Sequence, residues 1–204
     1  MKAVAVTLRV EIIPDHGERR DCLDQAWTKF LGACGLLPVL IPNIVEVALA
    51  LCENADLAGL LLTGGNDLAD LGGDAPERDR VENALLEFAE RRGLPVLGVC
   101  RGMQVIQHRF GVPLCRVEDH VAQKQTIRIN GEPREVNSYH RFGAFESRAP
   151  LQPWAVADDG VVKAVRHSTQ PVTGIMWHPE RIAPFSSADV QLVRKIFGVE
   201  ECAH

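Results

Sequence analysis

The segment LPVLGVCRGMQ, residues 94–104, decides the fold predicted for this chain. Leu94 to Val99 is a short apolar run typical of a buried strand, and a helix is predicted from Cys100 or Arg101 to about Phe110. Glycine stands two residues before and two residues after Cys100, which is the pattern of a strand–turn–helix elbow with cysteine in place of serine. The segment therefore predicts a parallel α/β sheet that presents a nucleophile at the carboxyl end of a strand.

The two glycines of this elbow, Gly98 and Gly102, have a steric explanation. A nucleophile at such a turn lies in a strained backbone conformation, and side chains at the flanking positions would collide with the strand or the helix. The start of the helix also places Cys100 beside unpaired N–H groups and the positive end of the helix dipole, which favours the thiolate. The pentapeptide alone leaves an alternative open, in which Cys100 is a buried core residue beside two glycines that occur by chance.

Outward from the elbow, apolar runs and helical periodicities alternate along the first half of the chain. The run Ala58–Leu62 has no polar position, so it is predicted to lie in the middle of a parallel sheet. The other elements expected here are strands over Val4–Val10 and Pro38–Ile41, and helices over Asp21–Cys34, from a cap at Asn43 to about Cys52, and over Asp79–Arg92.

Past Gly111 the pattern changes to short alternating segments, which predict antiparallel or edge strands before a closing helix over Ser187–Phe197. These strands are expected over Lys124–Ile129, Arg134–Ser138, Trp154–Ala157, Val161–Arg166 and Thr173–Trp177. The whole pattern predicts an α/β three-layer sandwich with a central, mostly parallel sheet and a few antiparallel edge strands, formed as a single domain over residues 1–204. A site is expected where the carboxyl ends of the parallel strands meet.

Composition narrows the classes of function. The formal net charge of −5 gives no reason to expect nucleic acid or an anionic membrane surface as a partner. Neither a signal peptide nor a long apolar run is evident, so a soluble, cytoplasmic protein is expected. The six cysteines are scattered without a C-x-x-C pair, and all but Cys100 are interpreted as structural: Cys22, Cys34, Cys52, Cys115 and Cys202. A homodimer stays open, because closed dimers leave no reliable mark in one sequence.

Two further segments supply partners for Cys100. His178 follows an apolar strand, and Glu180, two residues on, can orient its imidazole and stabilise the protonated form. The turn at Gly64-Gly65 follows the buried strand Ala58–Leu62, so the N–H groups of Gly65 and Arg101 could form an oxyanion hole. A plain Gly-Gly turn is the alternative. The histidines without such a partner, His16, His108, His167 and His204, are interpreted as structural.

These three segments, in this order and at these strand ends, resemble class I glutamine amidotransferase domains, in particular the γ-glutamyl hydrolase-like (peptidase C26) branch. The resemblance extends from Val4 to the closing helix. Its motifs look like those of γ-glutamyl-γ-aminobutyrate hydrolases, and they are Gly59 to Asp67, Arg78-Asp79 with Glu82, Leu97 to Gln104, Val136-Asn137-Ser138 with His140, and Trp177 to Glu180. The family implies a flavodoxin-like layered fold, with Cys100 as nucleophile, His178 as base and then acid, and Glu180 as orienter.

The resemblance also implies how the substrate is held. The residues similar to those that bind the glutamate moiety are Gly64, Gln104, Asn137, Ser138 and Tyr139, the last three through their backbone. His140 and Arg141 could line the leaving-group side. A surface glutamine and a solvated polar loop are the alternatives for these positions. The implied reaction is acyl transfer through a γ-glutamyl thioester, and no metal or organic cofactor is required.

The identity of the leaving amine is inferred from the resemblance of two shorter segments. The segments around Arg19-Arg20 and Asn137 to Phe142 look more like γ-glutamyl-CDP-amidate hydrolases, which serve phosphoramidate modification of capsular polysaccharide. In that case Arg19, Arg20 and Arg141 are candidate partners for phosphates, with solvated surface positions as the alternative for Arg19 and Arg20.

Other functions stay open. A γ-glutamyl-γ-aminobutyrate hydrolase, or a glutaminase subunit serving a separate synthase, would use the same site, although no synthase domain is present in this sequence. A different class is a non-catalytic or redox-sensing flavodoxin-like protein with Cys100 as an oxidisable thiol. Such a protein would not need His178 and Glu180.

Overall fold

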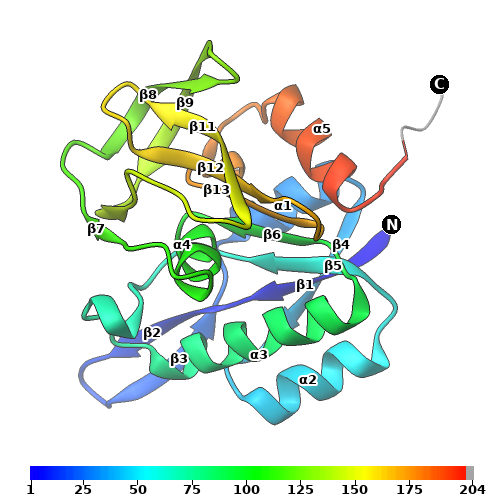
Figure 1. Cartoon of the computed structure of the whole chain (residues 1–204). Coiled ribbons are helices and arrows are strands. Elements are labelled where there is room, and N and C mark those ends of the chain that lie inside the picture. The colour runs from blue at the N-terminus through cyan, green and yellow to red at the C-terminus, as the bar shows by residue number, and fades with distance from the viewer. Residues whose placement is uncertain (201–204) are drawn as a thin grey trace.

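A nine-stranded sheet forms the centre of the molecule (Figure 1). The computed structural model describes residues 1–200, so Cys202 and His204 lie outside the described residues. The strands that pair in parallel are, in spatial order, β4 (Leu36–Ile41), β1 (Lys2–Thr7), β5 (Leu57–Leu62), β6 (Val96–Val99) and β13 (Val172–Ile175). The sheet continues in antiparallel pairing through β12 (Val162–His167), β11 (Leu151–Ala157), β8 (Val121–Ile129) and β9 (Glu132–Tyr139). The predicted α/β fold is therefore confirmed.

Helices cover both faces of this sheet. One apolar cluster joins the sheet to α2 (Val45–Asn54), α3 (Pro76–Arg92) and α4 (Arg101–Arg109), and a second joins it to α1 (Gln25–Ala33) and α5 (Ser187–Ile196). Successive strand side chains point to opposite faces, so Leu60 and Leu62 of β5 belong to the first cluster whereas Leu61 belongs to the second. This alternation within a continuous apolar run is what makes a buried strand.

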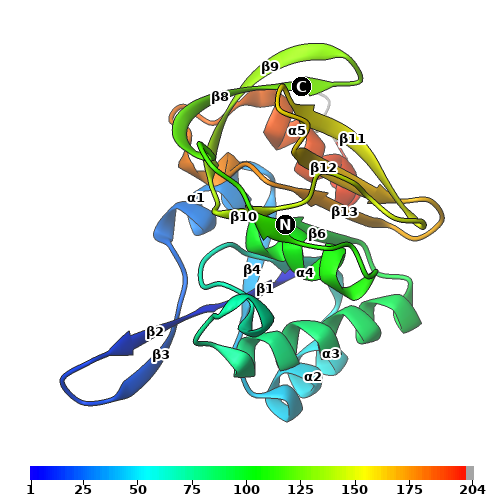
Figure 2. The ribbon, with the colours of Figure 1, turned by 60° about the vertical axis from the view of Figure 1, so that its left-hand side comes forward.

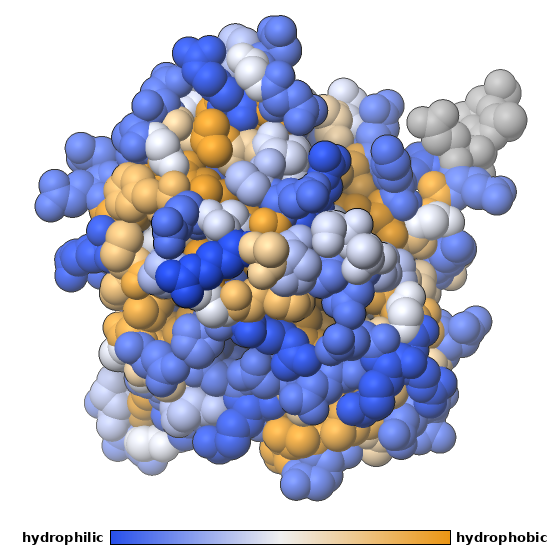
Figure 3. Space-filling view, viewed as in Figure 1, coloured by the Kyte–Doolittle hydropathy of each residue, from blue (hydrophilic) through white to orange (hydrophobic). Residues whose placement is uncertain are grey.

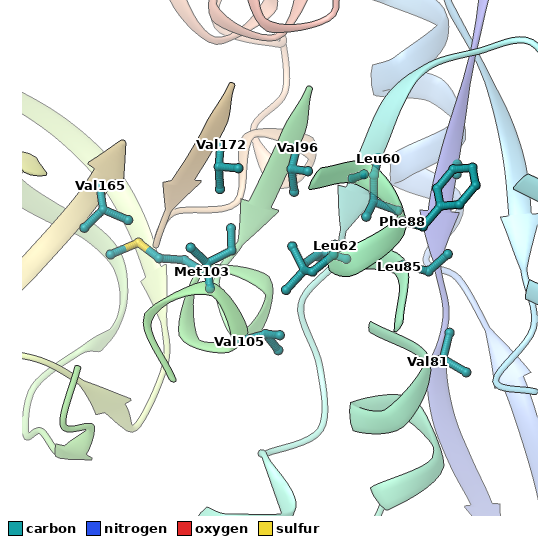
Figure 4. Close-up of a cluster of buried hydrophobic side chains, with 14 of the residues drawn as sticks. Leu60, Leu62, Val81, Leu85, Phe88, Val96, Met103, Val105, Val165 and Val172 are labelled. Carbon is teal, nitrogen blue, oxygen red and sulfur yellow. The ribbon is translucent and has the colours of Figure 1, made fainter. Parts of the chain in front are cut away.

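The first cluster packs α3 and α4 against the sheet. Figure 4 shows Met103 of α4 between the strand residues, with Leu85 of α3 turned toward the same cluster. Both side chains are fully buried. Since burying one such side chain contributes about 1.5–3 kcal/mol, this packing fixes the helix that follows Cys100.

Two predicted boundaries near the start of the chain were wrong, namely the end of the first strand and the start of the first helix. Strand β1 ends at Thr7, and the chain then forms a hairpin of β2 (Arg9–Ile13) and β3 (Glu18–Cys22) before α1 begins at Gln25. Figure 2 shows this hairpin projecting away from the sheet. Most of its side chains are exposed, so the apolar periodicity that marks buried elements is weak there.

Two other predictions were corrected. Asn43 does not cap α2, because Ile44 is the residue at the N-cap; the Asn43 side-chain amide donates instead to Leu8 O at 3.1 Å and to Asp21 Oδ1 at 2.6 Å. It therefore ties the hairpin to the sheet. Strand β13 pairs antiparallel with β12, as predicted, but it is not an edge strand, because its other side pairs in parallel with β6 inside the sheet. The short strands β7 (Cys115–Arg116) and β10 (Phe142–Gly143) were not predicted.

The surface carries one apolar area near α2, visible at the lower edge of Figure 3. Its exposed side chains on α2 are Val47 and Leu51, and Leu37 and Leu40 are exposed on the neighbouring edge strand β4. Within residues 1–200, no helix has both the length and the apolar character needed to cross a membrane.

Candidate active site

The three predicted site segments meet at one edge of the sheet. Thr63 and the two glycines follow β5, Cys100 follows β6, and His178 comes three residues after the end of β13. These three parallel strands are direct neighbours, in the order β5, β6, β13. Their carboxyl ends therefore place the glycine loop, the thiol and the imidazole side by side, with the thiol in the middle.

The elbow around Cys100 has the geometry that its glycines predict. Cys100 has φ +53° and ψ −107°, a left-handed conformation that costs a non-glycine residue about 1–3 kcal/mol. A Cβ on Gly98 would lie 2.5 Å from the backbone of Gly102, and a Cβ on Gly102 would lie 2.2 Å from Leu62 O. Glycine is thus required at both positions, and the turn holds the thiol at the first turn of α4.

His178 is held from both sides. Its Nδ1 lies 2.7 Å from Glu180 Oε1, and both side chains are buried. Its backbone is fixed by Asn137, whose Oδ1 accepts from the His178 N–H at 2.7 Å and whose Nδ2 donates to the His178 carbonyl at 2.8 Å. The side chain of Asn137 is therefore committed to His178, which leaves only its backbone for the predicted contact with substrate.

The electrostatics favour a charged imidazole. Burial alone would lower the pKa of His178, but a Cys100 thiolate and the hydrogen bonds to Cys100 and Glu180 outweigh it, so the pKa is raised to about 9. His178 is then protonated at neutral pH beside the sulfur. A protonated imidazole beside a thiol has the chemistry of a proton donor next to a candidate nucleophile.

Gly64 lies against both Cys100 and His178. A Cβ on Gly64 would lie 2.7 Å from His178 Cε1 and 3.5 Å from Cys100 Cβ. Any side chain here would push the imidazole away from the thiol. The next residue, Gly65, has φ +85°, which favours glycine for conformational reasons.

A buried charged cluster supports the glycine loop from behind, and its central residue is Arg78. The guanidinium donates to Thr63 O at 2.7 Å, to Gly64 O at 3.0 Å and to Gly65 O at 2.6 Å. In a trans peptide the N–H points opposite to the C=O, so a Gly64 carbonyl held by Arg78 turns the Gly65 N–H the other way. This orientation leaves the Gly65 N–H available as an oxyanion donor.

The same cluster fixes the second predicted donor, Arg101. Its guanidinium pairs with Glu82 and Asp79 of α3, while its backbone N–H belongs to the first turn of α4. Glu82 also accepts from Arg78 at 2.9 Å and from Thr7 at 2.8 Å. The sequence motif of Arg78, Asp79 and Glu82 thus acquires a structural explanation that sequence reasoning had not supplied.

Two hollows open on either side of this centre and share Arg9 and Gly65. The first, which we call the His178 pocket, has a volume of about 280 Å³ and includes His178, Glu180 and Arg181 in its lining. The second, the Cys100 pocket, measures about 530 Å³. It brings together most of the predicted site residues outside the histidine segment, namely Gly65, Cys100, Arg101, Gln104, Tyr139, His140 and Arg141.

Of the three arginines predicted to contact phosphate, only Arg141 lies at one of the two hollows. Arg19 donates to Glu77 Oε1 at 2.7 Å and to Asp74 O at 2.8 Å, and Arg20 pairs with Glu18 at 2.8 Å. Neither arginine lines the two hollows, whereas Arg141 lines the Cys100 pocket and Arg9 lines both. Sequence reasoning missed Arg9 because it assigned that residue to a continuous first strand.

A buried lysine behind the Cys100 pocket was also missed. Lys163 Nζ donates to Ser138 Oγ at 3.0 Å and lies 2.6 Å from His140 Nε2. Burial lowers the pKa of Lys163 to about 7, and burial with the nearby Lys163 charge lowers the pKa of His140 to about 2. His140 is therefore neutral, and its ring is fixed between Lys163 and the Phe142 carbonyl. The sequence signal that could have revealed it is a lysine within the otherwise apolar segment Val161–Val165.

A substitution at Asn137 tests whether its side chain positions His178 or binds the substrate. If His178 acts as the base expected from the sequence, replacing Asn137 by alanine should lower kcat about 100-fold with little change in KM, because a small displacement of a base has that order of effect. Steady-state kinetics on one γ-glutamyl substrate separate the two parameters. A rise in KM at unchanged kcat would show instead that the Asn137 side chain contacts the substrate.

Within residues 1–200, no group of three or more histidine, cysteine or carboxylate side chains is arranged to hold a metal ion.

Comparison with known proteins gives a family and several relatives. The Peptidase C26 family model matches residues 3–134 and 116–180. A γ-glutamyl-CDP-amidate hydrolase of Campylobacter jejuni is 28% identical over 201 residues, which is 96% of this chain and 98% of that protein. Anthranilate synthase component 2 of Thermococcus kodakarensis is 28% identical over 152 residues, 70% of this chain and 74% of that protein.

A solved structure has the same fold. The glutaminase domain of Trypanosoma brucei CTPS, with bound acivicin, superposes with a TM-score of 0.71 and covers 100% of this chain and 96% of its own. Its sequence identity is 15%, so the likeness concerns the fold.

Proposed function

Because this chain belongs to the peptidase C26 family, we propose that it is a cysteine-dependent hydrolase that cleaves a γ-glutamyl amide into glutamate and an amine. The family and the relatives support a hydrolase with γ-glutamyl hydrolase or glutamine amidotransferase-type function. The observation that carries the proposal is the arrangement of His178 between Glu180 and the strained Cys100. We also propose a single domain over residues 1–204, because one sheet takes strands from both halves of the chain.

In the first half of the proposed reaction, the Cys100 thiolate attacks the γ-carbonyl carbon of the glutamyl group. The carbonyl oxygen becomes an oxyanion that accepts hydrogen bonds from the Gly65 and Arg101 N–H groups. The C–N bond breaks as protonated His178 gives its proton to the leaving nitrogen, and a γ-glutamyl thioester remains on Cys100.

In the second half, neutral His178 takes a proton from a water molecule, and the resulting hydroxide attacks the thioester. Glu180 keeps the imidazole oriented and stabilises its charge in both halves, as the contact of 2.7 Å supports. Glutamate then leaves, and the imidazolium–thiolate pair is restored. Each step uses only residues of this chain and water.

For the amine we propose CDP-amidate, so that the substrate is γ-glutamyl-CDP-amidate in the phosphoramidate branch of capsular polysaccharide biosynthesis. The Campylobacter relative supports this choice because it is similar over nearly its whole length. The relative named as a synthase component favours a second candidate, a glutaminase subunit that passes ammonia to a partner.

The test compares kcat/KM for glutamate release from γ-glutamyl-CDP-amidate, γ-glutamyl-γ-aminobutyrate and glutamine. We expect the first to exceed the other two by roughly 100-fold, as differential binding of a charged leaving group allows. A preference for glutamine would favour the glutaminase subunit. Equal and poor values for all three would remove CDP-amidate as the substrate, and no glutamate from any γ-glutamyl amide would refute the hydrolase proposal itself.

A further inference from the structure

Under the proposed reaction, the two hollows correspond to the two halves of the substrate. The acyl half of a γ-glutamyl amide is bonded to the Cys100 sulfur in the thioester, so it occupies the Cys100 pocket with Gln104 and Tyr139. The leaving nitrogen must be within reach of the proton on His178. The amine half therefore extends into the His178 pocket, which lies on the other side of Gly65.

The charged side chains around the His178 pocket differ in whether they have a partner within the protein. Three carboxylates line the pocket: Asp24 accepts from the Ala26 N–H at 2.9 Å, Glu11 accepts from the Cys22 thiol at 3.6 Å, and Glu180 contacts His178 at 2.7 Å and Arg181 at 3.5 Å. Arg9 differs, because within residues 1–200 its guanidinium takes part in no hydrogen bond or ion pair, unlike Arg19 and Arg20 in the same hairpin. A cation without a partner therefore stands at this pocket.

Arg9 also packs against the glycine loop. A Cβ on Gly65 would be 3.3 Å from Arg9 Cβ and Cδ and 3.4 Å from its Nε, so the arginine side chain packs on the loop that carries the proposed oxyanion donor. A second cation, Arg181 in η2 (Pro179–Arg181), lines the same pocket and stacks over Tyr139 at 5.2 Å. Arginine is suited to phosphate because its planar fork can donate two parallel hydrogen bonds.

We propose that Arg9, assisted by Arg181, binds the anionic phosphoryl part of the leaving amine in the His178 pocket. The β2–β3 hairpin then sets selectivity for γ-glutamyl amides of phosphorylated amines, and the phosphate contacts expected of Arg19 and Arg20 are assigned to Arg9 instead. This inference rests on the proposed γ-glutamyl hydrolysis. It concerns the chemistry of the leaving group and not the cleavage of the amide.

The kinetic test replaces Arg9 by glutamine and measures kcat/KM for γ-glutamyl-CDP-amidate and for γ-glutamyl-p-nitroanilide, whose leaving amine is uncharged. The ratio of the two values is expected to fall about 10- to 100-fold, the usual size of a lost charge-assisted hydrogen bond. Arg20→Gln, made in the same hairpin, should leave the ratio unchanged. An unchanged ratio in the Arg9 variant, or an equal loss in the Arg20 variant, would overturn the assignment.

A binding test separates this inference from the proposed function. Inorganic diphosphate is titrated calorimetrically into the Cys100→Ala protein, with and without Arg9→Gln, so that no turnover is needed. The Kd is expected to rise about 10- to 100-fold when Arg9 is replaced. Equal affinities, or no binding to either protein, would refute the phosphoryl site even if amide hydrolysis is found. Conversely, Arg9-dependent binding in a protein that releases no glutamate would refute the hydrolase proposal alone.

Discussion

Replacing Cys100 by alanine is expected to lower kcat/KM for glutamate release by about 10⁴-fold or more. Removing the nucleophile of a triad leaves only the contribution of substrate binding and the oxyanion donors. The measurement is glutamate production from any γ-glutamyl amide that the wild-type protein cleaves. Cys115→Ala is the matched control, because that thiol is free and exposed and lies outside both hollows.

His178→Ala should cause a loss of similar size, and the double variant should be scarcely worse than either single one. Residues that act as one unit give strongly non-additive losses. If Cys100→Ala kept activity within tenfold of the wild type, the sulfur would not be the nucleophile. Additive losses in the double variant would contradict a joint role of the two side chains.

The sequence predicted the elbow because part of its geometry is local. Gly98 is required by the backbone of Gly102, four residues on, whereas Gly102 is required by Leu62 O on the neighbouring strand β5, which only the folded sheet brings near. His178 and Glu180 are two residues apart and interact directly. A motif of this kind carries most of its geometry within a few residues, so pattern reasoning can find it.

The hairpin shows where such reasoning stops. Its residues are mostly exposed, so they follow neither the period of a buried strand nor that of a helix, and Arg9 was assigned to the wrong element. The side-chain contacts of Asn137 and Lys163 were missed for another reason. Their partners, His178 and His140, are 41 and 23 residues away in sequence, and only the folded chain brings these groups together.

The buried charges behind the site link stability to catalysis. Arg78 holds the carbonyls of the glycine loop, and Arg101 belongs to the elbow, so both proposed oxyanion donors depend on one ion cluster. Glu82 is the carboxylate that contacts both arginines. A change at Glu82 therefore tests how much the fold depends on a cluster that sequence reasoning recognised only as a motif.

Glu82→Ala is expected to lower the free energy of unfolding by about 3–5 kcal/mol, because it leaves two buried guanidinium groups with insufficient negative charge. Denaturant unfolding, followed by tryptophan fluorescence, measures the loss. Glu87→Ala on the same helix is the control, since that side chain is 57% exposed and its removal should change stability little. Equal stabilities of the two variants would contradict a structural role for the cluster.

The pH dependence of the free energy of unfolding tests the role of Glu82 in a second way. Burial alone would raise the pKa of Glu82, but Arg101 and Arg78 hold it below its ordinary value of 4.5. A lowered folded-state pKa means that the contribution is fully present at neutral pH and is lost as the pH falls below 4.5 through the folded-state value. The stability difference between wild type and Glu82→Ala should accordingly narrow in acid. A difference that stays constant down to the acid transition would show that the glutamate contributes through packing and not through its charge.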